Sequence, residues 1–310
     1  MLLGEALAHP DIAGNYTRDQ YILMTKVGRI TATQFDYSPA WVRKSVMRSL
    51  ERLRSEYLDV VFCHDVEFVS EEEVLDAVRV LLEMVDEGHI KYVGISGYRI
   101  DVLARIARSV QEKYSRPLDI VQNWAQLTLQ NDRLAHEGLQ AFQKAGVSCV
   151  CSSSPLAIGL LRSNGVPVGD LGDFHPAPQG LRSAAKKAAD YVAARGESLA
   201  ALALRYSISR AQSISVSDFR VATIMGITSV AELEENLDTA RQVLRVTGEQ
   251  RWLWTPDDPT STKSECTKME EFKALVQLVQ DILGGWKDYC FPIPGDGWDV
   301  ARRRPVDTRL

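Results

Sequence analysis

The sequence lacks the features of several protein classes. It has no apolar run of the roughly 18 residues that a membrane-spanning helix needs. Its first residues, MLLGEALAHP, include Glu5 and lack the basic region of a secretory signal. With 36 basic and 41 acidic residues, the net charge is −5, so no basic field favours nucleic acid. We expect a soluble cytoplasmic protein that binds neither membranes nor nucleic acid.

Cysteine is scarce and odd in number, which argues against a disulfide framework. Three of the five thiols lie in apolar, strand-like runs, so we expect reduced and mostly buried side chains, as in a cytosolic protein. The C-x-C pair has no second pair at the spacing of a metal site, and we predict no metal. The five positions are Cys63, Cys149, Cys151, Cys266 and Cys290.

Several sequence motifs of nucleotide-binding and hydrolytic enzymes are also absent. No G-x-G-x-x-G follows a strand-like run, which disfavours the open dinucleotide-binding sheet. No G-x-S-x-G, H-E-x-x-H or Walker loop is present. Whatever chemistry the chain supports is therefore built in another way.

The chain does contain strand-like runs that are apolar on both faces, as buried parallel strands are. They are YILMT (21–25), LDVVFC (58–63), YVGIS (92–96), LDIVQ (118–122), VSCVC (147–151) and VATIM (221–225). Helical patterns separate most of them, so the strands are parallel and joined by crossover helices. We predict an α/β fold, a (β/α)8 barrel in one domain over 1–310, with a core at 1–245 and a C-terminal linker, helix and tail at 246–310.

The expected helices are marked by caps and by apolar spacing. Ser38-Pro39 begins one that runs to about Arg54. Ser70 and Glu73 form a capping box, and Gly88 closes that helix. The others are expected at 99–113, 132–145, 179–195, 198–206, 229–244 and 267–284. Between these, 163–178 is expected to be a loop, 211–220 an insertion and 255–265 a polar linker.

Six strands are fewer than the eight with which such a barrel closes. The chain also opens in a helical run, LLGEALAH, without a strand before it. We therefore expect a barrel that lacks its first two strands. Two exposed edges would follow, with lowered stability and a tendency to oligomerise through them.

Polar residues stand at the ends of four successive strand-like runs. In this fold the active site lies at the carboxyl ends of the strands. Lys26 and His64 end the first two runs, Ser96 with Gly97 ends the third, and Asn123 ends the fourth. A lysine facing a histidine suits proton transfer or orientation of a carbonyl.

Two loops after the last strands suggest a phosphate site. They are SSSPLAIGLL (152–161) and GITSVAELEENL (226–237), and the second opens a helix. Free backbone N–H groups at a helix N-terminus bind phosphate, and barrels often use these last loops for that purpose. Gly226 and Thr228 begin the second loop.

The ordered set of motifs resembles the aldo-keto reductases, in particular the L-galactose and D-arabinose dehydrogenase branch. The similar segments are LLGEAL, TKVGR, VVFCHDVE, YVGISGY, TLQN, SSSPLAIGLL and GITSVAELEEN, and VQDILGGWKDYCFP (278–292) is similar to fungal members. The resemblance implies a (β/α)8 barrel that binds NAD(P)H without a Rossmann motif. It also implies hydride transfer between the nicotinamide and a sugar or small carbonyl compound.

The resemblance assigns roles to individual residues. Lys26 and His64 match two of the family's four catalytic residues, whereas the Tyr and the Asp would precede Leu2. Ser96, Gly97 and Asn123, with Gln122 an alternative to Asn123, match the carboxamide contacts. Ser154, Leu156 and Gly159 match the pyrophosphate loop, and Glu235 with Asn236 match the adenine end.

Three further expectations follow from these matches. Glu232 stands where an arginine often holds the 2′-phosphate, so we expect NAD to be preferred over NADP. Without the Tyr as general acid, we expect slow turnover. Without the Asp, we expect the ammonium of Lys26 to be buried and to lack this carboxylate partner. A non-catalytic nucleotide-binding or partner-binding descendant is the alternative function, and an unrelated barrel is less favoured. The branch suggests a sugar lactol as substrate, and a ketone of secondary metabolism fits the sequence equally well.

Overall fold

The computed structural model describes residues 2–166, 172, 175–244, 246–247, 250–251, 263–295, 298–300 and 304–305. The chain divides into two compact units. Unit 1 comprises Met1–Gln122, Gln140–Cys149 and Ile293–Leu310, and unit 2 comprises Asn123–Leu139 and Val150–Pro292. Each unit is described by itself.

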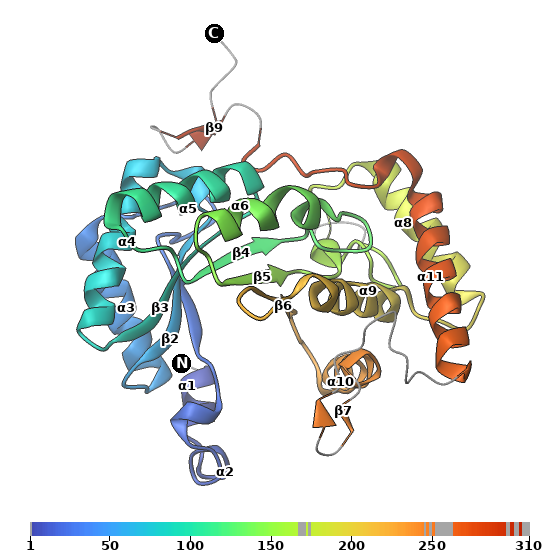
Figure 1. Ribbon diagram of the computed structural model, residues 1–310, viewed down its shortest axis with the longest axis horizontal. Helices are drawn as coiled ribbons and strands as arrows, with labels where there is room; N and C mark the ends of the chain where they lie inside the picture. The colour runs from blue at the N-terminus through green and yellow to red at the C-terminus, as the bar shows by residue number, and fades with distance from the viewer. Residues whose placement is uncertain are drawn as a thin grey trace. The chain divides into compact units, whose positions relative to one another are not determined.

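In unit 1, parallel strands alternate with helices, and the sheet order is β1-β2-β3-β4 (Figure 1). The strands are β1 (Met24–Val27), β2 (Leu58–His64), β3 (Ile90–Gly97), the first part of β4 (Ile120–Trp124), β9 (Trp298–Asp299) and β10 (Arg304–Pro305). The helices are α1 (Leu2–Leu7), α2 (Pro10–Ala13), η1 (Arg18–Gln20), α3 (Pro39–Leu53), η2 (Val66–Phe68), α4 (Glu71–Asp86), α5 (Ile100–Tyr114) and most of α6 (Leu139–Lys144).

In unit 2 the sheet order continues as β4-β5-β6. Its strands are the end of β4, most of β5 (Cys149–Ser153), β6 (Arg220–Ile224), β7 (Val246–Thr247) and β8 (Gln250–Arg251). Its helices are η3 (Leu134–Gly138), η4 (Ala157–Gly159), α8 (Gln179–Ala193), α9 (Leu199–Ile214), α10 (Val230–Leu244), α11 (Lys263–Leu283) and η5 (Gly284–Trp286). Within the described residues the main sheet thus has the six strands that the sequence predicts.

The core of unit 1 forms where α3, α4 and α5 pack their apolar faces on the sheet. The first six residues of β2 are buried, and each helix contributes a buried stripe, for example Val74, Val78 and Leu81 on α4. The predicted capping box at the start of α4 is present, with the Glu73 N–H donating to the Ser70 Oγ at 3.3 Å. The Glu73 carboxylate in turn accepts from the Ser70 N–H. Such caps stabilise a helix by about 1 kcal/mol.

The first strand differs from its prediction. The apolar run 21–25 was expected to be buried on both faces, but β1 covers Met24–Val27 and is largely exposed. Met24 is 42% exposed and Ile22 is 70% exposed. The reason is that β1 ends the order of described strands, so that only β2 covers it from the side. The apolar run 21–25 therefore overlaps only the first half of the observed strand.

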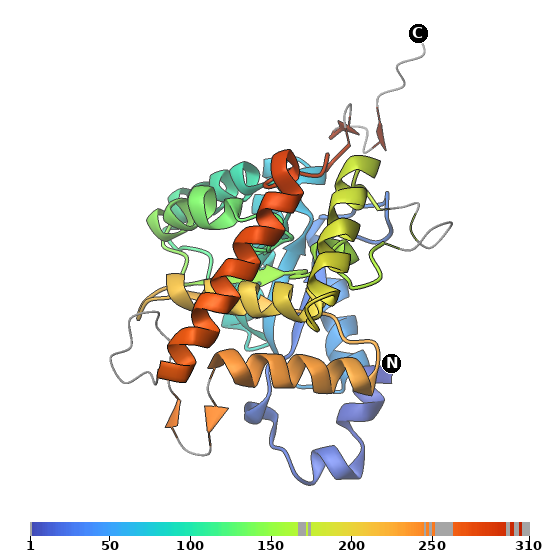
Figure 2. The ribbon, with the colours of Figure 1, turned by 90° about the vertical axis from the view of Figure 1, so that its right-hand side faces the viewer.

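In unit 2, the longest helices pack in pairs. Helix α11 runs beside α8, and α10 packs on α9 (Figure 2). Helix α9 was expected to end near 206 but continues to Ile214, because Leu204, Ile208 and Ala211 keep the spacing of one buried face. It takes in the first part of the expected insertion 211–220. The expected linker 255–265 is also shorter, since α11 already begins at Lys263; its remainder lies outside the described residues.

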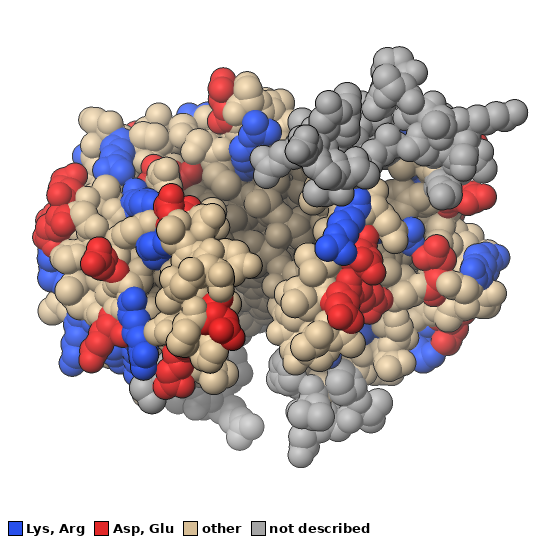
Figure 3. Space-filling model, turned by 90° about the horizontal axis from the view of Figure 1, so that it is seen from below, with Lys and Arg blue, Asp and Glu red and all other residues tan. Residues whose placement is uncertain are grey.

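Charges of both signs are interspersed over the face shown in Figure 3, without a large field of either sign. Among the residues that the structure describes, no helix combines the length and the apolar character needed to span a membrane.

Candidate functional site

Unit 1 brings Lys26, His64 and Ser96 to neighbouring strand ends. His64, the last residue of β2, lies opposite Ser96 of β3, and Lys26 lies opposite Phe62 of β2. The Lys26 Nζ is 5.9 Å from the centre of the Phe62 ring. Lys26 is within β1 rather than after it, and its side chain is exposed, so the expectation of a buried ammonium is wrong. The cause is again the position of β1 at the end of the strand order.

His64 is held from two sides by neighbouring residues. Its backbone carbonyl accepts a hydrogen bond from the Tyr37 hydroxyl, and its Nε2 lies 3.6 Å from the Asp65 Oδ2. Burial lowers the pKa of His64, and the positive charges of Lys26 and Arg29 lower it further, against the raising effect of Asp65. The imidazole is therefore neutral at pH 7, with one nitrogen that donates and one that accepts.

Tyr37 itself is not placed to act as an acid. Its ring is 1% exposed, and burial raises the pKa of its hydroxyl well above the usual value. Since that hydroxyl already donates to the His64 carbonyl, Tyr37 acts on His64 by positioning it.

An aromatic group that contacts Arg29, the partner of Asp65, was not predicted from the sequence. Phe35 and Phe68 stack with ring centres 5.1 Å apart, and Trp298 meets both edge-on. The Trp298 Nε1 donates to the Phe68 carbonyl at 3.1 Å. The Arg29 guanidinium lies over both phenylalanine rings and pairs with Asp65. These residues fix the segment after β2 that carries Asp65.

Glu67 is a second feature that sequence reasoning missed. Its side chain is buried, and its Oε1 accepts the Tyr98 N–H at 2.6 Å. Gly97 has to be glycine here, because a Cβ would lie 2.1 Å from the Glu67 Oε2. Glu67 therefore holds the backbone directly after Ser96. Burial raises the pKa of Glu67 to about 7, outweighing the hydrogen bonds that lower it.

We expect Glu67→Gln to remove the part of the pH dependence of the free energy of unfolding that comes from titration of Glu67. A raised folded-state pKa means that the stability linked to neutral Glu67 is present below the unfolded value of about 4.5 and is lost as the pH rises through about 7. Between pH 5 and pH 8 the wild type should therefore lose of the order of 2–3 kcal/mol that the Gln variant keeps. Urea unfolding at both pH values measures this, with the exposed Glu72→Gln as control. Parallel pH profiles for wild type and Glu67→Gln would contradict it.

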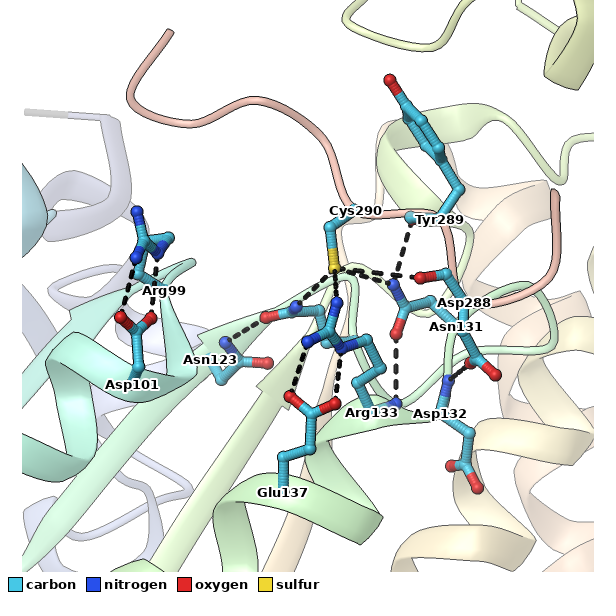
Figure 4. Close-up of polar contacts among 11 residues, drawn as sticks. Arg99, Asp101, Asn123, Asn131, Asp132, Arg133, Glu137, Asp288, Tyr289 and Cys290 are labelled. Atoms are coloured by element: carbon cyan, nitrogen blue, oxygen red, sulfur yellow. Dashed lines mark hydrogen bonds and ion pairs between the residues drawn. The ribbon is translucent and has the colours of Figure 1, made fainter. Parts of the chain in front are cut away.

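In unit 2, Asn123 lies near the end of β4, next to the end of β5. The Ser153 Oγ donates to the Asn123 carbonyl at 3.4 Å, and the Ala125 N–H donates to the Ser153 carbonyl at 2.9 Å. The Asn123 side chain is fully buried and donates to Gln126 at 2.9 Å (Figure 4). The alternative residue Gln122 is also buried.

The predicted pyrophosphate loop has an unusual backbone. Ser154, Ala157, Ile158 and Gly159 all have positive φ, between 48° and 94°. Such turns direct successive N–H groups to one side and form concave anion sites. The Ser154 N–H donates to the Ile224 carbonyl at 3.1 Å, which joins this loop to the end of β6. Within the loop, the Ala157 N–H donates to the Ser154 carbonyl and the Gly159 N–H to the Leu156 carbonyl, both at 2.9 Å.

The second predicted loop leads into α10. The Glu232 carboxylate accepts from the Thr228 N–H at 2.8 Å and from the Thr228 hydroxyl at 2.7 Å. These hydrogen bonds lower the pKa of Glu232, and the charge of Arg162 lowers it further. Gly226 and Thr228 are exposed, as is Glu235, whereas Asn236 is half-buried. Glu232 is thus an ionised carboxylate at the start of the helix.

The residues present fit an NAD(P) cofactor in kind. Ser96 with Gly97, in unit 1, is a neutral polar group of the kind that suits a carboxamide, and the fully buried Asn123 belongs to unit 2. The residues expected to bind the phosphate groups lie in the positive-φ loop after β5. The residues expected to bind cofactor are thereby divided between the two units.

Comparison with known proteins identifies the family. The model of the aldo/keto reductase family matches residues 1–247. The chain belongs to this family. Aldo-keto reductases use NAD(P)H as cofactor.

Two curated relatives narrow the comparison. The chain is 38% identical over 240 residues to D-arabinose 1-dehydrogenase of Saccharomyces cerevisiae, covering 77% of this chain and 68% of the relative. It is 34% identical over 221 residues to L-galactose dehydrogenase of Arabidopsis thaliana, covering 71% and 64%. The matches thus span about two thirds of these relatives. They confirm the predicted branch of the family.

Solved structures agree on the fold. An aldo-keto reductase from Bacillus halodurans in its holo form superposes with a TM-score of 0.56 at 21% identity, covering 89% of this chain and 76% of that one. A glycerol dehydrogenase from Gluconobacter oxydans gives 0.58 at 20% identity, covering 93% and 77%. The (β/α)8-type α/β fold class predicted from the sequence is therefore confirmed.

Proposed function

We propose that the chain binds NAD(P) and interconverts a sugar lactol, or a similar small alcohol, with its carbonyl form. The observation that carries the proposal is the set of Lys26, His64 and Ser96 at neighbouring strand ends. When bound, the nicotinamide accepts or gives the hydride. The chain's own residues orient the reacting oxygen and exchange its proton.

His64 takes the main role toward the substrate in this proposal. As a neutral imidazole it can donate a hydrogen bond to a carbonyl oxygen, or accept the proton of a hydroxyl. Lys26 adds a positive charge beside it, which favours the alkoxide form of the substrate oxygen. Ser96, whose neighbouring backbone is held by Glu67, contacts the carboxamide of the cofactor.

The proposal is tested by titrating the 310-residue chain with NADH and NADPH, followed by assays on aldoses and small aldehydes. Nucleotide binding with turnover supports the dehydrogenase. Nucleotide binding without any turnover points to the non-catalytic descendant. In that case, variants of Lys26 and His64 should show no turnover either. Binding of neither nucleotide would refute both.

We further propose that NAD is preferred, because the ionised Glu232 would repel a 2′-phosphate and can accept from a 2′-hydroxyl. Glu232→Arg should therefore lower the Kd for NADP by about tenfold or more, since about 1.4 kcal/mol corresponds to a factor of ten. Glu232→Gln, which keeps an acceptor for Thr228, should lower it less and change the Kd for NAD little. Fluorescence titration with both nucleotides measures this. Tighter binding of NADP than NAD by the wild type would contradict the preference.

A further inference from the structure

In unit 1, aromatic rings from three separate segments of the chain pack against one another. Phe35 follows β1, Phe68 is the last residue of η2, and Trp298 lies in β9. The two phenylalanine rings stack with centres 5.1 Å apart, and the Trp298 ring meets them edge-on at 6.2 and 5.0 Å. Stacked and edge-on pairs are the favourable geometries of aromatic rings. The three rings therefore hold the segments after β1 and β2 together.

Trp298 is itself fixed on this group. Its Nε1 donates to the Phe68 carbonyl and its backbone N–H to the Gly295 carbonyl, both at 3.1 Å. Trp298 also pairs with Pro305 where β9 and β10 run antiparallel. The Phe35 ring beneath it is 5% exposed. A segment near the C-terminus thus secures the end of η2 and the ring of Phe35.

Phe35 and Arg29 are the two ends of one short turn. They form an antiparallel bridge with each other. The Arg29 guanidinium donates to the carbonyls of Thr31 and Ala32, both at 3.1 Å, so it is tied to its own turn. A displacement of Phe35 would therefore displace Arg29 with it.

Arg29 and His64 meet the same oxygen of Asp65. The Arg29 Nη1 forms an ion pair with the Asp65 Oδ2, and the His64 Nε2 lies 3.6 Å from that oxygen. The Asp65 side chain is only 8% exposed, so water screens its charge weakly. Burial lowers the pKa of His64, Asp65 raises it, and Lys26 of β1 and Arg29 lower it. Arg29 thus competes with the imidazole for the charge of Asp65.

We propose that Trp298 is a positioning residue for His64. By holding Phe35 against Phe68 it keeps Arg29 on Asp65, and so it limits the negative charge that acts on the imidazole. The inference rests on the proposed role of His64 in proton exchange with the substrate. It assigns no contact between Trp298 and either substrate or cofactor, and every residue in it belongs to unit 1.

The direct test is an NMR titration of the His64 imidazole in the whole chain, which needs neither cofactor nor turnover. His64→Gln assigns the signal among the five histidines. In Trp298→Ala, Arg29 moves off Asp65, so the carboxylate favours the imidazolium and the titration midpoint should move to higher pH. Trp298→Phe keeps an edge-on ring without the indole N–H and should move it less. Trp41→Ala, at a half-buried tryptophan of α3, is the matched control and should leave the midpoint unchanged.

A double-mutant cycle tests the route. Arg29→Gln should move the midpoint in the same direction and at least as far, because it removes the competing cation. Adding Trp298→Ala to Arg29→Gln should move it no further, because both changes remove the same step. An unchanged midpoint in Trp298→Ala, or additive shifts in the cycle, would overturn the inference. If Trp298→Ala did not fold, the cycle would be measured with Trp298→Phe, with the same expectations.

The consequence for turnover is a loss that is confined to low pH. A neutral His64 is needed to accept the proton of a hydroxyl, so kcat of Trp298→Ala for alcohol oxidation should fall about three- to tenfold on the acid limb, since one pKa unit is a factor of ten. At alkaline pH kcat should match the wild type. An equal loss at every pH would show a merely structural role and overturn the inference. If the wild type bound no nucleotide, the proposed function would fail, whereas a shifted His64 midpoint would still support the action of Trp298 on His64.

Discussion

His64→Ala is expected to lower kcat for sugar oxidation by about 10²–10⁴-fold, the usual contribution of a positioned proton donor or acceptor. The neutral imidazole at the end of β2 is the group placed to meet the substrate oxygen. Its backbone carbonyl is held by Tyr37 and its ring lies beside Asp65. The Kd for NADH should change little, because Ser96, Asn123 and the loop after β5 are unaltered. Stopped assays with excess enzyme can follow turnover even if the wild type is slow.

His64→Gln and Lys26→Met separate the two roles. Gln keeps a donor near the substrate oxygen and should retain more activity than Ala. Lys26→Met removes a charge from an exposed position and should lower kcat without loss of stability. The positive charge of Lys26 lowers the pKa of His64. Lys26→Met removes this charge, so the acid limb of the pH–rate profile should move to higher pH. Unchanged kcat in both His64→Ala and His64→Gln would rule out the assignment.

The sequence located β2, which is buried, and β6, of which only Val221 is buried, to within one residue. The run 58–63 became β2 with one residue added, and 221–225 was displaced by a single residue. It failed at β1, where the apolar run 21–25 lies partly before the strand. β1 stands at the end of the strand order, so most of its side chains are exposed. The periodicity of the sequence does not show which strand stands at the end of a sheet. Helix α9 was cut short because a suspected insertion outweighed the apolar spacing at Ile208 and Ala211.

The sequence placed polar residues at or near the ends of apolar strands, as at His64 of β2 and Asn123 of β4, and their roles in the site stay predictions. Glu67 and Trp298 were missed for a common reason. Each acts through a partner far away in the chain: Tyr98 for Glu67 and Phe68 for Trp298. A single sequence contains no local signal for such pairs. For Glu67, the glycine after Ser96 was the only trace, and it was interpreted as a cofactor contact.

Gly28→Ala should be among the most destabilising substitutions in unit 1, and it tests how the strand end supports His64. Gly28 has φ of +98°, and a Cβ would lie 2.3 Å from the Tyr37 Cε2. Tyr37 is 1% exposed and tied to the His64 carbonyl, so its ring has little room to move. The strain of positive φ costs about 1 kcal/mol, and the clash adds a few more, for a total of about 3–5 kcal/mol.

Gly88→Ala isolates the first of these two costs. Gly88 has φ of +83°, with nothing within 4 Å of the added Cβ, so that variant should lose only about 1 kcal/mol. In the Gly28→Ala background, Tyr37→Leu should cost far less than it does alone, because the shorter side chain relieves the clash. Urea unfolding of the four variants gives these values, and kcat of Gly28→Ala should fall with the displacement of the His64 carbonyl. Equal losses in Gly28→Ala and Gly88→Ala would mean that the Tyr37 ring moves freely, and that it does not hold His64 in place.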